Sequence, residues 1–172
     1  MTAGAATPVL ETPRLRLRPH VAADFEALAA LWADPEVTRH IGGRPSTREE
    51  SWARLLRYAG LWRLCGFGYW AVEDRATGRF LGDLGFADFQ RAMDPPAPAL
   101  PEIGWVLAPH AQGRGLATEG AAAALAWLAR PCFCIIAPAH AGSLRVATKL
   151  GFRQQGLARY REDAVAVLVR EG

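Results

Sequence analysis

An apolar segment that runs into a glycine-rich turn and then into an alanine-rich helix is the feature that most constrains the fold of this chain. Residues 102–107 read as a buried strand, residues 112–117 as the turn, and the residues after Gly115 as the start of the helix. Gly113 and Gly115 carry no Cβ, so the backbone can bend tightly and bring its N–H groups close to a ligand. Because the positive end of the helix faces the same point, the pattern predicts a binding site for a phosphate group.

Two nucleotide-binding motifs also contain a glycine-rich turn before a helix, but the surrounding residues disfavour both of them. A P-loop requires Lys followed by Ser or Thr after its last glycine, whereas Gly115 is followed by Leu116 and Ala117. A dinucleotide-binding motif places an acid about 20 residues further on, yet residues 120–161 contain no Asp or Glu. The arginines of the same stretch favour an anionic ligand if they face the turn, and otherwise they only solvate surface helices.

The glycine turn resembles the pyrophosphate signature of a known enzyme family. That signature, Gln/Arg-x-x-Gly-x-Gly/Ala, belongs to the GNAT superfamily of N-acetyltransferases. Gln112, Gly115 and Ala117 stand at its defined positions.

Two further segments resemble the ribosomal-protein N-terminal (Rim-type) branch of that superfamily. Residues 140–152 are similar to its Asn-x-x-Ser-x-Arg-Val-x-x-Lys-Leu-Gly-Phe block, and residues 10–18 are similar to its first strand. The resemblance covers residues 10–169, nearly the whole chain. One departure is His140, which stands where the branch usually has Asn.

The resemblance implies an α/β (α+β) architecture, the single-domain GNAT fold. This fold has a mixed, mostly antiparallel sheet of about six to seven strands, splayed at the centre and flanked by about four helices. A chain of 172 residues with 51% hydrophobic residues can bury such a core without disulfides or metal. We therefore expect one domain over residues 10–170, preceded by a disordered N-terminus at residues 1–9.

The hydrophobic periodicity along the chain predicts a matching order of elements. Strands are expected at residues 14–18, 69–73, 79–86, 102–107, 133–137, 152–161 and 164–169, and helices at residues 25–32, 46–65, 116–128 and 142–150. Ser46 and Glu49 have the spacing of a capping box and are expected to open the second helix. Gly78 can supply the positive φ of a hairpin turn between the second and third strands.

The resemblance implies that the ligand of the glycine turn is acetyl-CoA. In GNAT enzymes the strand at residues 102–107 bulges near its end and parts from the strand at residues 133–137. The pantetheine arm lies in the resulting gap and bonds to the free strand edge. The cofactor-binding residues that follow are Trp105, Val106, Leu107, Gln112, Gly113, Arg114, Gly115, Leu116, Ala117, Thr118, His140, Ser143 and Arg145. The chemistry needs no metal.

Direct transfer of an acetyl group to an amine needs a proton acceptor, a dipole for the developing oxyanion and a proton donor for the thiolate. Glu102 is the candidate general base, and the alternative is a solvated or salt-bridged strand residue. A backbone N–H released by a bulge near Val106 is the candidate oxyanion donor, and the alternative is an ordinary paired strand. The resemblance places Ser143 near the thiol as proton donor, a role compatible with capping the helix.

Other side chains carry weaker signals. His140 can shuttle protons near neutral pH or bond the pantetheine amide, and the alternative is a loop residue without a special role. His20, His40 and His110 show no metal-ligand spacing. Tyr160 lies in a late hairpin, where packing is favoured over lining the acceptor pocket.

Composition disfavours several other function classes. Cys65, Cys132 and Cys134 lack a partner pair at metal spacing and indicate neither a disulfide framework nor a zinc site. The formal charge of +3 is small and the arginines are scattered, which argues against a nucleic-acid partner. No apolar segment approaches the length of a membrane span and no signal-peptide pattern opens the chain. We therefore expect a cytoplasmic protein without a membrane partner, and the abundance of Arg and Ala suggests a GC-rich bacterial genome.

Together these expectations predict an acetyl-CoA-dependent N-acetyltransferase, in which a primary amine attacks the thioester directly. Resemblance to the Rim-type branch implies a peptide or protein N-terminus as acceptor. The alternative acceptor is a small amine, such as a polyamine, an aminoglycoside or an amino acid. Alternatives without this chemistry are a non-catalytic acyl-CoA-binding sensor and a plain interaction domain. The family resemblance is compatible with a homodimer, although no residue argues for one.

Overall fold

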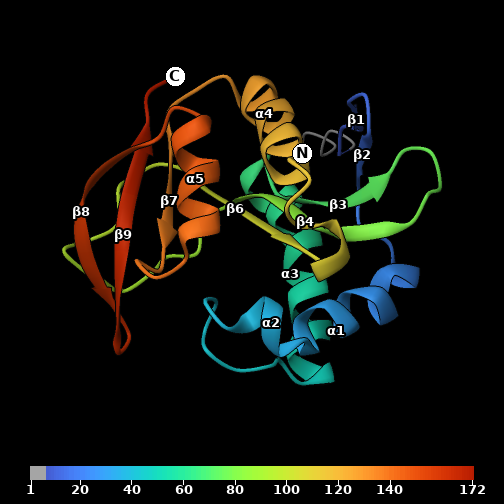
Figure 1. Cartoon of the computed structure of the whole chain (residues 1–172), viewed down its shortest axis with the longest axis horizontal. Helices are drawn as coiled ribbons and strands as arrows, with labels where there is room; N and C mark the ends of the chain where they lie inside the picture. Colours follow the sequence, from blue (N-terminus) through green and yellow to red (C-terminus); the bar gives the residue numbers. More distant parts are fainter. Residues whose placement is uncertain (1–6) are drawn as a thin grey trace.

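The computed structural model describes residues 7–172, which build one nine-stranded sheet with helices on both faces (Figure 1). The strand order is β1-β2-β3-β4-β6-β7-β9-β8-β5, and neighbours pair antiparallel except β6 and β7, which are parallel. The strands are β1 (Leu10–Glu11), β2 (Leu15–Arg18), β3 (Tyr69–Asp74), β4 (Phe80–Ala87), β5 (Met93–Asp94), β6 (Glu102–Leu107), β7 (Cys132–Ile136), β8 (Arg153–Tyr160) and β9 (Asp163–Arg170). The helices are α1 (Phe25–Ala33), α2 (Pro35–Thr38), α3 (Arg48–Cys65), α4 (Leu116–Leu128) and α5 (Ala141–Lys149), with short 3₁₀ turns η1 (Ala22–Asp24) and η2 (Pro109–Ala111).

The fold class predicted from the sequence is confirmed, with more elements than expected. The strands beyond the expected range are β1 and β5, which are two residues long and too short to show an alternating apolar pattern. The additional helix is α2, a four-residue turn that begins after Asp34, whose carboxylate accepts a hydrogen bond from the N–H of Glu36. Within the described residues, no helix combines the length and the apolar character needed to cross a membrane.

The helix α3 begins later than predicted, because its capping box uses Thr47 and Glu50 rather than Ser46 and Glu49. The hydroxyl of Thr47 accepts from the N–H of Glu50 at 3.2 Å, and the Glu50 carboxylate accepts from the N–H of Thr47 at 2.8 Å. Ser46 is held in the preceding loop, where its N–H donates to the carbonyl of Trp32 at 2.8 Å. The predicted cap was therefore wrong by one residue.

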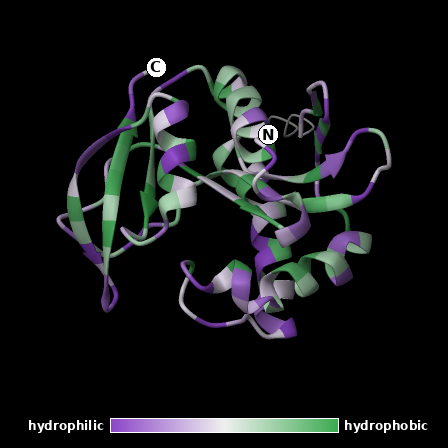
Figure 2. Cartoon of the chain, viewed as in Figure 1, coloured by the Kyte–Doolittle hydropathy of each residue, from purple (hydrophilic) through white to green (hydrophobic). Residues whose placement is uncertain are grey.

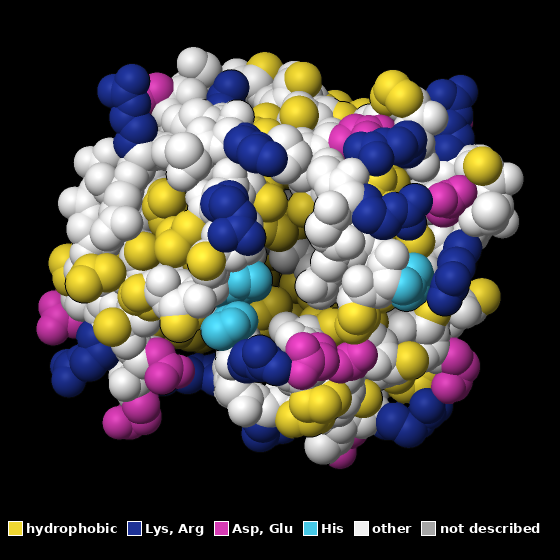
Figure 3. Space-filling view, in the orientation of Figure 1, with side chains coloured by type: hydrophobic (Ala, Val, Ile, Leu, Met, Phe, Trp, Pro, Cys, Tyr) yellow, Lys and Arg dark blue, Asp and Glu magenta, His cyan; other side chains and the backbone are white. Residues whose placement is uncertain are grey.

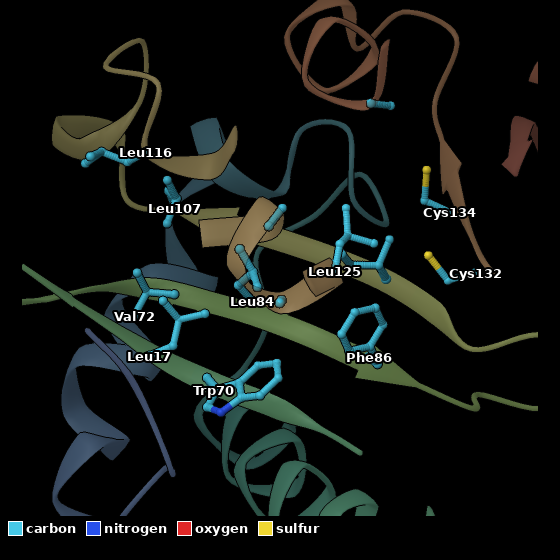
Figure 4. Packing of buried hydrophobic residues seen from close by; sticks show 14 of the residues in the cluster. Leu17, Trp70, Val72, Leu84, Phe86, Leu107, Leu116, Leu125, Cys132 and Cys134 are labelled. Atoms are coloured by element: carbon cyan, nitrogen blue, oxygen red, sulfur yellow. The ribbon is translucent and has the colours of Figure 1, made fainter. Parts of the chain in front are cut away.

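Two apolar clusters hold helices against the two faces of the sheet. On one face, α4 contributes Leu116 and Leu125, which join Leu84 and Phe86 of β4 in one cluster (Figure 4). A Cβ at Gly120 would lie 3.2 Å from a methyl carbon of Leu84, so this glycine lets α4 approach the sheet closely. On the opposite face, α1 and α3 pack against β3, β4 and β6. The central strands β7 and β9 are hydrophobic along most of their length (Figure 2), as strands covered by other elements are expected to be.

The N-terminal segment is anchored to the sheet beside β3. Residues 1–6 of the N-terminus predicted to be disordered lie outside the described residues. Beyond them, the carbonyl of Pro8 accepts a hydrogen bond from Nε1 of Trp70 at 2.8 Å, and the Trp70 side chain is fully buried. The only polar group of that indole is thereby satisfied, as a buried tryptophan requires.

A buried carboxylate, Asp83 on β4, ties α1 and α3 to the sheet. It is fully buried, accepts from Nε1 of Trp32 at 2.8 Å and from the hydroxyl of Tyr58 at 3.5 Å, and lies 3.3 Å from Nε2 of His20. Burial is the main cause that raises the pKa of Tyr58 well above its ordinary value, and the charge of Asp83 is the second cause. The Tyr58 hydroxyl therefore remains a donor. The cluster thereby fixes the helices that cover one face of β6.

Replacing Asp83 with Ala should lower the free energy of unfolding by about 3 kcal/mol, because the indole and phenol donors would remain buried without their acceptor. Urea denaturation followed by tryptophan fluorescence measures this change. Asp88→Ala is the matched control, since Asp88 follows the same strand but is exposed, and its effect should stay within about 0.5 kcal/mol. A loss below about 1 kcal/mol at Asp83 would contradict the role given to the cluster.

Candidate active site

The parallel strands β6 and β7 separate soon after they begin, and their divergence opens a gap in the middle of the sheet. In the part of the chain that the structure describes, their register contains the single pair Glu102–Phe133. By contrast, β6 pairs with β4 along its whole length. The space-filling view shows a hollow near the centre of the molecule, with a hydrophobic floor and histidine, lysine or arginine side chains around its rim (Figure 3).

The edge of β6 that faces this gap offers backbone groups to a ligand. The N–H of Ala108 donates to the carbonyl of Leu81 at 2.8 Å, and from there the register of β6 with β4 continues without a shift. Bonded and non-bonded pairs alternate in an antiparallel ladder, so the N–H groups of Trp105 and Leu107 point toward the gap. The carbonyl of Leu107 is already engaged, because it accepts from Nε2 of Gln112 at 2.8 Å.

The bulge predicted near Val106 is absent, and that prediction was wrong. Val106 pairs with Asp83 in an unshifted register, and by the same alternation its N–H faces β4. The free backbone donors arise because β7 turns away from β6, and the strand contains no extra residue. The candidate oxyanion donor therefore moves from Val106 to its neighbours Trp105 and Leu107.

The glycine turn lies at the outer end of the gap, between β6 and α4. Gly113 has φ +71° and Gly115 has φ +77°, both in the left-handed region that favours glycine. The turn is exposed, and α4 begins directly after it. The N–H groups of Leu116, Ala117 and Thr118, in the first turn of α4, have no acceptor within the helix. A phosphate group placed at this point would accept hydrogen bonds from them.

The start of α5 brings His140 and Ser143 to the opposite wall of the gap. Nδ1 of His140 accepts from the N–H of Ser143 at 3.5 Å, so His140 is the N-cap of α5. Across the gap, Nε1 of Trp105 donates to Oγ of Ser143 at 3.4 Å. These three predicted site residues are therefore brought together, whereas Arg145 is exposed on α5.

The imidazole of His140 reproduces the donor and acceptor pattern of the asparagine that it replaces in Rim-type sequences. Burial lowers the pKa of His140, and the imidazole of His40, stacked at 4.6 Å between ring centroids, lowers it further. Since Nδ1 accepts the capping bond, the neutral ring carries its proton on Nε2. The ring therefore keeps one acceptor for the helix end and one donor for a ligand, as an asparagine amide does.

Protonation of His140 would release this cap, so the protein should lose stability in acid. The folded-state pKa lies below the ordinary value of about 6.5, so in the acid range the unfolded chain binds the proton more readily. The contribution is complete above about pH 6.5 and is lost as the pH falls through the folded-state pKa. Urea unfolding from about pH 5 to 7.5 measures it against His140→Asn, which keeps a cap acceptor that does not titrate. Identical pH slopes for the two proteins would contradict the assignment.

Glu102 lies at the inner end of the gap, where an arginine holds its carboxylate. Nε and Nη2 of Arg91 donate to its two oxygens at 2.7 and 2.8 Å. Burial alone would lower the pKa of Arg91, but the bonds to Glu102 raise it overall. The guanidinium also lies over the rings of Phe89 and Tyr160, at 4.4 and 4.7 Å from their centroids. Glu102 is therefore salt-bridged to Arg91, and the ring of Tyr160 packs against the guanidinium of Arg91.

The hydroxyl of Tyr69 lies against β6 beside Glu102, and the predicted site residues did not include it. A Cβ at Gly104 would collide with this hydroxyl, so the glycine makes room for it. Burial and then the nearby charge of Glu102 raise the pKa of Tyr69, so the phenol keeps its proton. A glycine inside an apolar strand is a signal of such close approach, and Gly104 is the signal that could have revealed Tyr69.

A second hollow, of about 520 Å³, adjoins the inner end of the gap. Glu102 and Phe133, the pair at which β6 and β7 meet, both line it, and the proline-rich segment between β4 and β6 forms much of its wall. Both acids on this wall are engaged, Glu102 by Arg91 and Asp88 by the side-chain amide of Gln90 at 2.6 Å. Most residues that line the hollow are therefore apolar, its two acids are engaged, and Arg130 adds a further positive charge to the wall.

A splayed sheet with a glycine turn at its open end suits a ligand that carries both amides and phosphates, and comparison with known proteins identifies the family. The family described as Acetyltransferase (GNAT) domain matches residues 14–153. The chain belongs to the GNAT acetyltransferase family. It is an N-acetyltransferase, and its cofactor is acetyl-CoA.

Individual relatives agree with this assignment. YoaA of Bacillus subtilis strain 168, described as an uncharacterized N-acetyltransferase, is 27% identical over 159 residues, which cover 88% of this chain and 86% of YoaA. A GnaT-family protein of Bordetella pertussis has a similar structure, with a TM-score of 0.80 and 32% identity, covering 94% of this chain and 98% of that one. RimL, a ribosomal L7/L12 alpha-N-protein acetyltransferase solved in complex with coenzyme A, matches with a TM-score of 0.77 and 17% identity, covering 95% and 98%. The likeness to RimL is one of fold.

Proposed function

We propose that this GNAT enzyme acetylates the α-amine of a peptide or protein N-terminus. The observation that carries the proposal is the hollow at the inner end of the gap, where an acyl group held between β6 and β7 would meet its acceptor. Its apolar wall and internally paired acids suit an uncharged residue next to the amine. A polyamine or aminoglycoside would bury further ammonium groups there without a partner, which is costly. RimL, which shares the fold, is described as acting on a protein N-terminus.

In this proposal acetyl-CoA supplies the thioester and lies along the gap. The glycine turn from Gln112 to Gly115, together with the first N–H groups of α4, binds the diphosphate. The backbone of Leu107 bonds the pantetheine arm, with Nε2 of His140 as a donor from the opposite wall. Arg145, exposed on α5, adds positive charge near the phosphates.

The side chains and backbone of the gap supply the groups that the transfer needs. The N–H of Trp105 donates to the thioester oxygen as it gains negative charge. Oγ of Ser143 already accepts from the Trp105 indole, so its own O–H is left to donate to the departing sulfur. Glu102 accepts the proton of the amine through a water, since a carboxylate has about four lone-pair sites and Arg91 occupies two. One C–N bond forms as one C–S bond breaks, and one proton leaves the amine as one reaches the sulfur.

The acceptor class can be tested by measuring thiol release from acetyl-CoA with a panel of amines. A peptide with an uncharged N-terminal residue should give a kcat/KM at least about tenfold above that of spermidine, because burial of an unpaired ammonium costs more than about 1.4 kcal/mol. An aminoglycoside and a free amino acid complete the panel. A preference for spermidine would overturn the acceptor assignment and leave the acetyl transfer intact. Tight acetyl-CoA binding without thiol release from any amine would indicate a non-catalytic acyl-CoA sensor.

Ser143→Ala and Glu102→Gln should each lower kcat by about 100-fold, since each removes a proton-transfer group. The KM for acetyl-CoA should change little in Ser143→Ala, because the cap of α5 uses the backbone N–H of that residue. Thr148→Ala is the control, since it removes another hydroxyl from α5 that bonds to the helix backbone. Unchanged kcat under chemistry-limited conditions would remove Ser143 as donor, and full activity of Glu102→Gln across the pH range would remove Glu102 as base.

A further inference from the structure

An acid stands in the first turn of α4, next to the glycine turn that receives the cofactor diphosphate. This residue, Glu119, would repel the phosphates if its charge were free. Its carboxylate instead accepts three hydrogen bonds, from Oγ1 of Thr12 at 2.6 Å, from the N–H of Arg14 at 2.9 Å and from Nε of Arg14 at 2.7 Å. Burial alone would raise the pKa of Glu119, but these bonds lower it, so the group stays ionised and paired.

Arg14 connects this acid to the glycine turn itself. Nη1 of Arg14 donates to the carbonyl of Arg114, in the middle of the turn, at 2.9 Å. Nη2 lies beside Gly115, at 3.6 Å from the position that a Cβ would occupy there. Arg14 immediately precedes β2 and is about half exposed, with a side-chain exposure of 49%. One guanidinium thus bonds the helix acid and the carbonyl of the turn, and its remaining nitrogen lies beside Gly115.

We propose that Arg14 is a positioning residue for acetyl-CoA, which holds the glycine turn open, neutralises Glu119 and presents Nη2 to the diphosphate. The bond engages the Arg114 carbonyl, an oxygen that would repel a phosphate if it faced the ligand. The planar fork of arginine makes this possible, because it can donate in several directions at once. The inference concerns the cofactor and does not depend on which amine accepts the acetyl group.

The test compares Arg14→Ala with Arg75→Ala. Arg75 is equally exposed and also anchors the N-terminal segment, since it donates to the carbonyl of Thr12 at 3.0 Å and pairs with Glu11, without a bond to the glycine turn. Calorimetry should show that Arg14→Ala weakens coenzyme A binding by at least about tenfold, as expected for lost charge-assisted hydrogen bonds. Arg75→Ala should bind coenzyme A like the wild-type protein.

A second thioester distinguishes positioning of the diphosphate from a general loss of structure. S-acetylpantetheine lacks the diphosphate, so its kcat/KM, measured with any amine that the enzyme accepts, should be unchanged in Arg14→Ala while that of acetyl-CoA falls. Equal losses with both thioesters, or unchanged coenzyme A binding, would overturn the proposal.

A double variant keeps the test decisive if Arg14→Ala folds poorly. Arg14→Ala combined with Glu119→Gln removes the repulsive charge, so it should recover part of the lost coenzyme A affinity. Failure of the double variant to bind more tightly than Arg14→Ala would overturn the neutralising role. If neither of these variants folds, Arg14→Lys keeps the charge without the fork and should still weaken coenzyme A binding with S-acetylpantetheine turnover unchanged, and wild-type affinity would refute the proposal.

Discussion

The divergence of β6 from β7 is the constraint on which the rest of the site depends. A continuous parallel pair would use every backbone group of β6, whereas here the N–H groups of Trp105 and Leu107 are left facing a gap. Unmet backbone donors cost about 1–3 kcal/mol each when they are buried. A ligand with amide carbonyls would remove that cost, and in the proposed function the pantetheine arm of acetyl-CoA is that ligand. The strand tolerates the arrangement because β4 holds it along its other edge.

The acids nearest the gap are paired with arginines from elsewhere in the chain, and this pairing sets the local charge. Glu119 in α4 is bound by Arg14, 105 residues earlier, and Glu102 in β6 is bound by Arg91 in the preceding segment. Their negative charges are therefore compensated, and the positive end of α4 can favour an anion at the glycine turn. The same ion pairs therefore hold separate segments of the chain together and set the charge around the gap.

Local patterns predicted the elements of this protein well, and long-range contacts explain what they missed. The strand, turn and helix around Gly115 and the order of the remaining elements follow from periodicity and glycine placement, both of which act over a few residues. The cap at Ser46 was displaced because its N–H bonds Trp32, and the bulge at Val106 proved unnecessary because β7 itself moves away. Arg14 has no local signal, since its role exists only once its segment meets α4.

The two ends of the gap differ in charge, and this difference would favour one orientation of a bound ligand over the other. At the outer end, the exposed glycine turn, the start of α4 and a neutralised Glu119 would favour a diphosphate. At the inner end, the charge of Glu102 is compensated by Arg91, and the adjoining hollow offers apolar walls. In the proposed binding mode, this difference favours one orientation of acetyl-CoA, with the diphosphate at the outer end and the acyl group at the inner end. The proposed acceptor, a peptide N-terminus that is neutral beyond its amine, would suit the adjoining hollow for the same electrostatic reason.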